Sequence, residues 1–130
     1  MQPVAVERWH GVVKARDTAL LGELIADGAV FQSPAVHAPQ EGKALTMKYL
    51  ESALAVLGNP SFRYLNEWVG PTSAVLEFET EVDGLVINGV DIIEWDDAGC
   101  ITRFKVMVRP VKALNRLIEL MGAELRRRAG

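Results

Sequence analysis

The sequence predicts a single α+β domain in which helices pack against one face of a curved, mixed or antiparallel sheet. Two observations indicate this class. Apolar residues recur at helical spacing over the first part of the chain, and from residue 62 onward the period changes to two. The chain has 130 residues, so we expect one domain over 1–130, because neither half alone would hold a good core.

Two helices and a strand are expected at the N-terminal end. Apolar side chains three and four residues apart predict a helix over 4–15. Asp17 is placed to cap a second helix by accepting its first N–H groups, and Gly28 is placed to end that helix. Residues 29–33 then form a short strand that Pro34 ends.

Two longer helices follow in the prediction. The third helix covers residues 43–57, after a loop over 34–42, and Gly58-Asn59-Pro60 ends it. A C-terminal helix over 111–128 carries an apolar stripe wider than one small core obviously needs. We therefore expect this helix to pack either over the mouth of a pocket or against a second subunit.

Between the third and fourth helices, the period of two predicts an antiparallel meander of strands. Asp83-Gly84 is a hairpin signal between two of the strands. The glutamates of the 76–82 strand and the basic residues of the 101–109 strand are expected opposite one another on a shared outer face. The first strand is expected to hold these residues on one face: Phe62, Tyr64, Asn66 and Trp68.

Asp91 lies in the apolar strand segment GVDIIEW, residues 89–95. Alternation places it on the same face as Ile93 and Trp95, the face expected to be buried. Burying an ionised carboxylate costs several kcal/mol unless it is paired or protonated. Asp91 is therefore the strongest candidate for a functional residue. The alternative is that it completes a buried hydrogen-bond network.

Composition argues against several classes of protein. The net charge of −3 and the absence of a basic face argue against nucleic-acid binding. The single cysteine, Cys100, predicts an inert packing thiol and no disulfide. The histidines His10 and His37 are far apart and predict no metal site, and the sequence predicts no cofactor. With no 18-residue apolar run and no signal-peptide layout, we expect a cytoplasmic protein without a membrane span.

Three segments carry a resemblance to a known family: RWHGVVKARDTALLGELIADGAVFQSP (8–34), the Gly42-Lys43 start of the third helix, and GVDIIEWDDAGCITRFKV (89–106). In their order and spacing the chain resembles the nuclear transport factor 2-like superfamily, in particular its SnoaL-like and ketosteroid-isomerase-like branch. The resemblance implies a cone, in which a strongly bent sheet wraps around three N-terminal helices and leaves a deep apolar pocket. It also implies a homodimer formed through the outer sheet face.

The resemblance transfers site residues only in part. In ketosteroid isomerases the general base is an aspartate before a proline, and the matching pair here is Ser33-Pro34. A serine hydroxyl is not a resting proton acceptor near neutral pH, so that mechanism is not expected. The isomerase tyrosine on the first helix matches Trp9. The protonated acid of the isomerases matches Asp91, which also resembles the acid/base residue of SnoaL-type polyketide cyclases.

The resulting hypothesis is a SnoaL-like protein that binds a small, largely apolar molecule, with Asp91 as the catalytic acid or base of a cofactor-free isomerase, cyclase or dehydratase. The alternative is a non-catalytic ligand-binding or dimeric assembly domain. His37 is expected in the loop over the pocket mouth. The predicted ligand-binding residues are Trp9, Val13, Phe31, Ser33, His37, Tyr49, Tyr64, Trp68, Phe78, Trp95, Phe104 and Val106.

Overall fold

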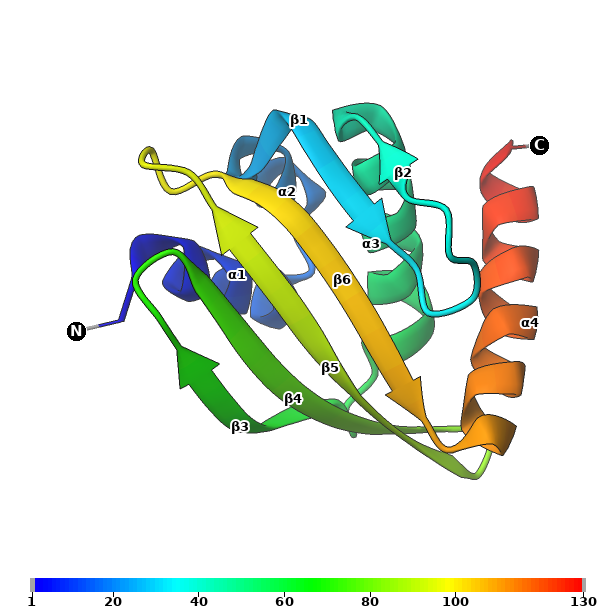
Figure 1. Ribbon diagram of the computed structural model, residues 1–130. Coiled ribbons are helices and arrows are strands. Elements are labelled where there is room, and N and C mark those ends of the chain that lie inside the picture. Colours follow the sequence, from blue (N-terminus) through cyan, green and yellow to red (C-terminus); the bar gives the residue numbers. More distant parts are fainter. Residues whose placement is uncertain (1, 130) are drawn as a thin grey trace.

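The structure is a computed structural model that describes residues 2–129 (Figure 1). Its elements follow the predicted order, except that a two-residue strand, which pairs with the strand before it, lies within the predicted loop over 34–42. The helices are α1 (Val4–Ala15), α2 (Thr18–Leu24), α3 (Lys43–Leu57) and α4 (Val111–Ala129). The strands are β1 (Ile25–Gln32), β2 (Gln40–Glu41), β3 (Arg63–Val69), β4 (Ser73–Val82), β5 (Leu85–Trp95) and β6 (Ile101–Arg109).

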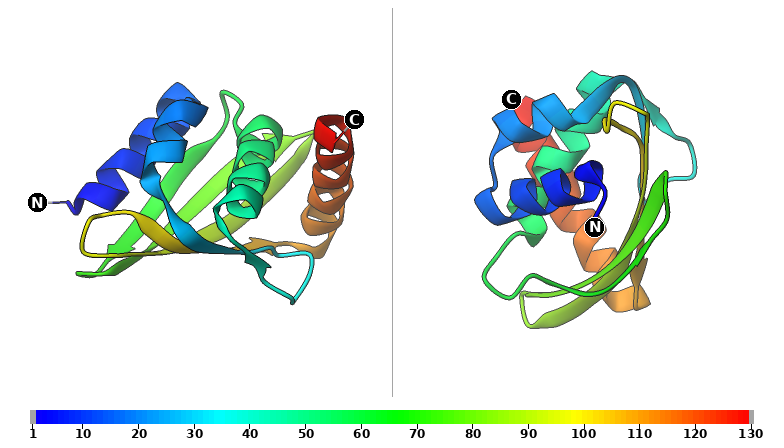
Figure 2. Two further views of the ribbon diagram at one scale, coloured as in Figure 1. Left: turned by 90° about the horizontal axis from the view of Figure 1, so that it is seen from above. Right: turned by 90° about the vertical axis from the view of Figure 1, so that its left-hand side faces the viewer.

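The strands form one open, curved sheet in the order β2-β1-β6-β5-β4-β3. β1 runs parallel to β6, and the other neighbours are antiparallel. The helices α1, α2 and α3 lie on the face toward which the sheet bends, and α4 stands beside α3 at the end of the sheet (Figures 1 and 2). The predicted α+β class and the cone-like wrapping of the sheet are confirmed.

A local signal accounts for the start of α2 but not for its end. Oδ1 of Asp17 accepts the N–H groups of Ala19 and Leu20 at 2.9 and 3.3 Å, which confirms the predicted N-cap of α2. The predicted end of α2 at Gly28 was wrong. The backbone becomes extended at Ile25 (φ −87°, ψ 126°). It does so because Ile25 is buried and pairs with β6.

A β-bulge changes the direction of side chains along β3. Tyr64 pairs with Phe78 of β4, but the next register pair is Asn66 with Glu77, so Leu65 is an extra residue. Beyond the bulge the faces are exchanged, and Trp68 lies opposite Val75 on the outer face with 58% of its surface exposed. The expectation that Tyr64 and Trp68 share a face was therefore wrong.

The charged rows of the outer face are not direct neighbours, contrary to the prediction, because β5 lies between β4 and β6. Asn88 on β5 bridges the gap. Its Nδ2 donates to Glu77 Oε2 at 3.0 Å, and Arg109 Nη1 donates to Asn88 Oδ1 at 3.4 Å. An amide thus connects an acidic residue of β4 with a basic residue of β6.

The core consists of two apolar clusters, one under α1 and α2 and the other under α4. The first contains Trp9 and Phe104, and the second contains Phe78 and Leu117. Tyr64 packs against both clusters. The region between them is where the candidate site lies.

Candidate functional site

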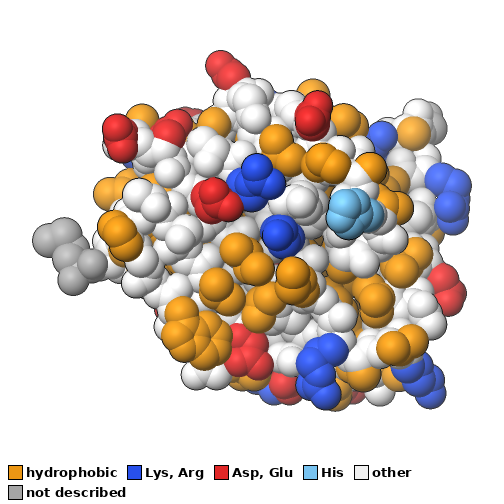
Figure 3. Space-filling view, in the orientation of Figure 1, with side chains coloured by type: hydrophobic (Ala, Val, Ile, Leu, Met, Phe, Trp, Pro, Cys, Tyr) orange, Lys and Arg blue, Asp and Glu red, His pale blue; other side chains and the backbone are white. Residues whose placement is uncertain are grey.

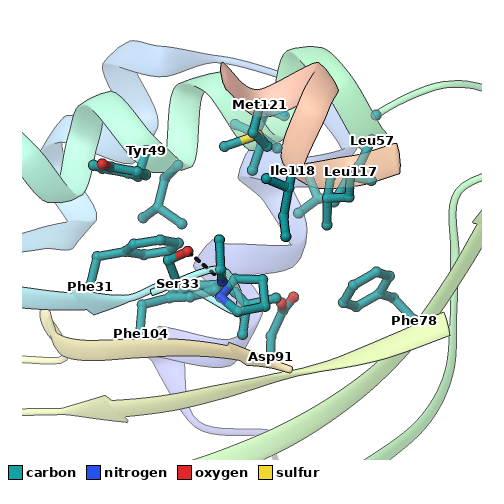
Figure 4. Close-up of a pocket in the computed structure, with 18 of the residues that line it drawn as sticks. Phe31, Ser33, Tyr49, Leu57, Phe78, Asp91, Phe104, Leu117, Ile118 and Met121 are labelled. Atoms are coloured by element: carbon teal, nitrogen blue, oxygen red, sulfur yellow. Dashed lines mark hydrogen bonds between the residues drawn. The ribbon is translucent and has the colours of Figure 1, made fainter. Parts of the chain in front are cut away.

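A cavity of about 250 Å³ lies between the sheet and helices α3 and α4 (Figure 4). Its wall is almost entirely apolar. The lining residues that carry polar side-chain atoms are Asp91, Ser33, Trp9, Tyr49 and Tyr64. Small-molecule sites typically combine an apolar wall with a few polar groups in this way. The volume is just below the usual range of about 300–1,000 Å³, which suits a ligand smaller than a typical drug.

Most of the predicted ligand-binding residues line this cavity. They come from α1, β1, α3 and the inner faces of β3 to β6, which alternation directs inward. In the cavity wall the structure places Trp9, Val13, Phe31, Ser33, Tyr49, Tyr64, Phe78, Asp91, Phe104 and Val106.

Asp91 is the charged residue at the floor of the cavity. It lies on the inner face of β5 between Leu76 of β4 and Val106 of β6, and its side chain is only 6% exposed. Figure 4 shows its carboxyl group pointing from β5 toward Leu117 and Ile118 of α4. The carboxyl group therefore faces the cavity and not the sheet.

A chain of two hydrogen bonds holds the carboxyl group. The O–H of Tyr64 donates to Oδ2 of Asp91 at 2.6 Å, and the Nε1–H of Trp9 donates to the Tyr64 oxygen at 2.8 Å. Trp9 also packs edge-on against Phe104, with ring centroids 4.8 Å apart, so its indole is fixed. Within residues 2–129 no hydrogen bond is found for Oδ1 of Asp91, which leaves this oxygen available to a ligand.

The environment of Asp91 changes its acidity. Burial raises the pKa of Asp91 from 3.8 to about 7, although the hydrogen bond from Tyr64 acts in the opposite direction. Burial also raises the pKa of Tyr64 well above its usual value, and the neighbouring Asp91 carboxylate adds to this. Tyr64 therefore remains a hydrogen-bond donor at neutral pH, where Asp91 is present in both its ionised and its protonated form.

Ser33 lines the cavity in a turn that shapes the loop after β1. Its Oγ accepts the backbone N–H of Ala35 at 2.9 Å (Figure 4). Such a bond is typical of a serine that stabilises a turn. The hydroxyl hydrogen remains able to donate to a ligand, while part of the acceptor capacity of Oγ is used by the loop.

Three predicted residues lie away from the cavity wall. His37 lies in the exposed loop before β2. Trp68 lies on the outer face, because of the bulge in β3. Trp95 lines a separate hollow near the start of α1, beyond a shift of register between Glu94 and Trp95. The bulge thus explains why Trp68 misses the cavity, whereas Trp95 stays on the inner side, packed against the first apolar cluster, but lies at the end of β5 near the start of α1.

The helices contribute cavity residues that the prediction did not name. They lie on α3 and α4 and in the loop after β1, and include Leu54, Leu57, Val36, Leu117, Ile118 and Met121. The signal for α4 was the wide apolar stripe over 111–128. Of the two expected positions for this helix, the structure has the one over the pocket.

Neither a metal site nor a membrane span is found in the described part of the chain. Over residues 2–129, no three or more His, Cys, Asp or Glu side chains gather closely enough to hold a metal ion. None of the helices described over that range is both long and apolar enough to cross a membrane.

Comparison with known families agrees with this architecture. Residues 6–104 match the SnoaL-like domain. The chain belongs to the SnoaL-like family. No match was found among curated proteins.

Solved structures similar to this SnoaL-like chain include a steroid delta-isomerase from Pseudomonas aeruginosa, 35% identical over 96% of this chain and 88% of the other, with a TM-score of 0.83. An uncharacterised cystatin-like-fold protein from Silicibacter pomeroyi is 28% identical over 92% and 84%, with a TM-score of 0.84. The epoxide hydrolase/cyclase-like enzyme SalBIII, which acts in pyran ring formation in salinomycin, is 17% identical over 80% and 86%, with a TM-score of 0.62. The similarity to SalBIII is a similarity of fold alone.

Proposed function

We propose that this SnoaL-like chain binds a small, largely apolar molecule in the cavity, and that Asp91 holds the single polar group of that molecule and transfers a proton. One observation carries the proposal. A carboxyl group with a pKa of about 7 faces a largely apolar cavity, with one oxygen held by Tyr64 and the other available. A group whose pKa lies near the working pH is suited to general acid–base catalysis.

The proposed chemistry needs one group that both takes and returns a proton. Ionised Asp91 removes a proton from a carbon next to a carbonyl group and leaves an enolate. In a β,γ-unsaturated ketone, the same carboxyl group then returns the proton to the γ carbon, so that the double bond moves into conjugation with the carbonyl group. Tyr64 supports the ionised form by donating to Oδ2.

The likeness to a steroid delta-isomerase supports the isomerase class. The corresponding base at position 33 is a serine, however, so the proposal assigns the proton transfer to Asp91. A second candidate function is non-catalytic binding, in which the Trp9–Tyr64–Asp91 chain of hydrogen bonds only stabilises the fold. The existence of that chain favours this candidate, and the experiments below separate the two.

Binding is tested with 2-naphthol and naphthalene, which differ by a single hydroxyl group. Calorimetry should give the wild-type protein about tenfold higher affinity for 2-naphthol, since a hydrogen bond to a charged group contributes about 1.5–3 kcal/mol. Asp91→Asn should reduce that preference strongly. Glu77→Gln on the outer face is the matched control and should keep it. If Asp91→Asn leaves the preference intact, Asp91 does not hold the polar group.

Catalysis is tested with 2-tetralone, an apolar ketone with acidic protons beside its carbonyl group. In D₂O, NMR should show that the protein accelerates exchange of these protons, and that Asp91→Asn returns the exchange to the rate without protein. Binding of 2-naphthol without acceleration of exchange would leave the non-catalytic candidate and remove the catalytic one.

We further infer that two copies of this chain associate through the outer face of the sheet. Figure 3 views this face and shows hydrophobic side chains gathered near its centre. By register the patch consists of Trp68, Val75, Val90, Ile92 and Met107. Trp68 and Met107 are exposed, which is costly for an isolated chain and usual at an interface.

The dimer is tested by sedimentation. Met107→Glu should dissociate it, while Val111→Glu, an exposed apolar position at the start of α4, should not. A wild-type protein that sediments as a monomer at high micromolar concentration would contradict the inference.

A further inference from the structure

The cavity opens at one identifiable place. Most residues in its wall are buried or half-buried, but Val36 and Ile118 are 50% and 39% exposed. Val36 belongs to the loop after β1, and Ile118 belongs to α4. In Figure 1 that loop passes close to the middle of α4. Because these wall residues contact both the cavity and solvent, the mouth lies between the loop and α4.

On the α4 side of this mouth, Gly122 leaves the space beside the helix to the side chain of Arg126. It lies one helical turn after Ile118 and lines the cavity. A Cβ built at Gly122 would contact, within 4 Å, only Nη1 of Arg126, at 3.3 Å. Glycine within a helix is about 1 kcal/mol less favourable than alanine. The fold therefore does not require a glycine here, but a side chain at this position would narrow the mouth.

Arg126 places a positive charge over that space. Side chains of a helix lean toward its N-terminus, so Arg126 extends over Gly122, one turn before it. The neighbouring Arg127 and Arg128 both bond to Glu124, and Arg128 also reaches Glu51. For Arg126 no ion pair occurs among residues 2–129.

We propose that the ligand is an elongated molecule that extends out through this mouth, with its polar end at Asp91, an apolar body along Ile118 and Gly122, and an anionic group at Arg126. The inference rests on the proposed function and adds the class of ligand: an apolar molecule with a hydroxyl or carbonyl group at one end and a carboxylate at the other. Only the outer end of such a ligand needs a charge, since the cavity wall is apolar.

The test compares 1-alkanols with ω-hydroxyalkanoates of the same length, using the eight- and ten-carbon members at pH 8. Two lengths are used so that one of them spans the distance between the two ends of the site. Calorimetry should give the hydroxyalkanoate of the better-fitting length about three- to fivefold higher affinity than its alkanol, the usual effect of an exposed ion pair. Arg126→Gln should remove that difference, and Arg127→Gln should keep it.

In the second arm of the test, a larger side chain at Gly122 narrows the mouth of the cavity. Gly122→Leu should lower the affinity for both the alkanol and the hydroxyalkanoate at least tenfold. Gly11→Leu is the matched control, because Gly11 is also within a helix and has no atom within 4 Å of a built Cβ. Gly122→Ala, which favours the helix, should lower the affinity for the probes less than Gly122→Leu does. Circular dichroism verifies that each variant is folded.

The outcomes separate this inference from the proposed function. If the alkanols bind in a way that depends on Asp91 but the hydroxyalkanoates bind no more tightly at either length, the inference is overturned and the proposed function stands. The same holds if folded Gly122→Leu binds the probes as the wild type does. If neither the alkanols nor the hydroxyalkanoates bind although 2-naphthol does, the inference is likewise overturned. If 2-naphthol does not bind the wild-type protein either, the proposed function itself fails.

Discussion

The phenol of Tyr64 on β3 donates a 2.6 Å hydrogen bond to Asp91 on β5, although β4 lies between these two strands. The strands are two spacings apart, about 10 Å, so the bond depends on the reach of the tyrosine side chain across the inner face. The bond ties the edge strand to the floor of the cavity. It also holds Oδ2 of the carboxyl group, while Oδ1 has no hydrogen bond among residues 2–129.

Removing the Tyr64 hydroxyl should make Asp91 a weaker acid. Because the hydrogen bond from Tyr64 lowers the pKa of Asp91, Tyr64→Phe should raise that pKa above 7. Stability at pH 8 should fall by about 1–3 kcal/mol, since a buried carboxylate loses its donor. Titration of the Asp91 carboxyl carbon by NMR measures the pKa. Tyr49→Phe, also in the cavity wall, is the control and should leave it unchanged.

Stability should depend on pH through Asp91. Its pKa is raised from 3.8 to about 7, so the folded protein binds this proton more tightly than the unfolded chain. The free energy of unfolding should therefore fall as the pH rises from about 4 to about 7 and then level off. A shift of about three units corresponds to about 4 kcal/mol. Urea denaturation of wild type and Asp91→Asn isolates this contribution, and parallel pH curves for the two proteins would contradict it.

Trp9 should stabilise the fold through its hydrogen bond to Tyr64. Trp9→Phe removes the N–H that donates to the tyrosine oxygen and should cost about 1–2 kcal/mol, which includes the loss of packing. In the Tyr64→Phe background the same change should cost less, because its partner is already absent. A double-mutant cycle of urea denaturation measures this coupling. Additive costs would mean that the indole only fills space.

Gly89 should be required where β5 passes the ring of Phe78. A Cβ at Gly89 would lie 2.4 Å from the Met107 carbonyl oxygen and 2.7 Å from Cζ of Phe78. Gly89→Ala should therefore destabilise the protein by about 1–3 kcal/mol, as overpacking does. Gly28→Ala in β1, where a built Cβ meets nothing within 4 Å, is the control. Equal midpoints of thermal unfolding for the two variants would refute the requirement.

Sequence reasoning succeeded where one element decides the outcome. The period of two placed Asp91 and Phe104 on the inner face, and Asp83-Gly84 forms the predicted turn with φ values of 53° and 76°. It failed where the position of a side chain depends on how neighbouring strands pair. The bulge at Leu65 turned Trp68 outward, and the sheet order inserted β5 between the acidic and basic rows. Neither the extra residue nor the strand order leaves a periodic signal.

The sequence by itself determined the α+β class, the family resemblance, and the burial of Asp91 in an apolar strand. These follow from which residues share a face of one helix or strand, which is a local property of the chain. Only the tertiary structure decided that Tyr64 is the partner of Asp91, that α4 covers the cavity, and that its mouth lies beside Gly122 and Arg126. These relationships join residues far apart in the sequence, and they are set by the register of the strands and the packing of helices on the sheet.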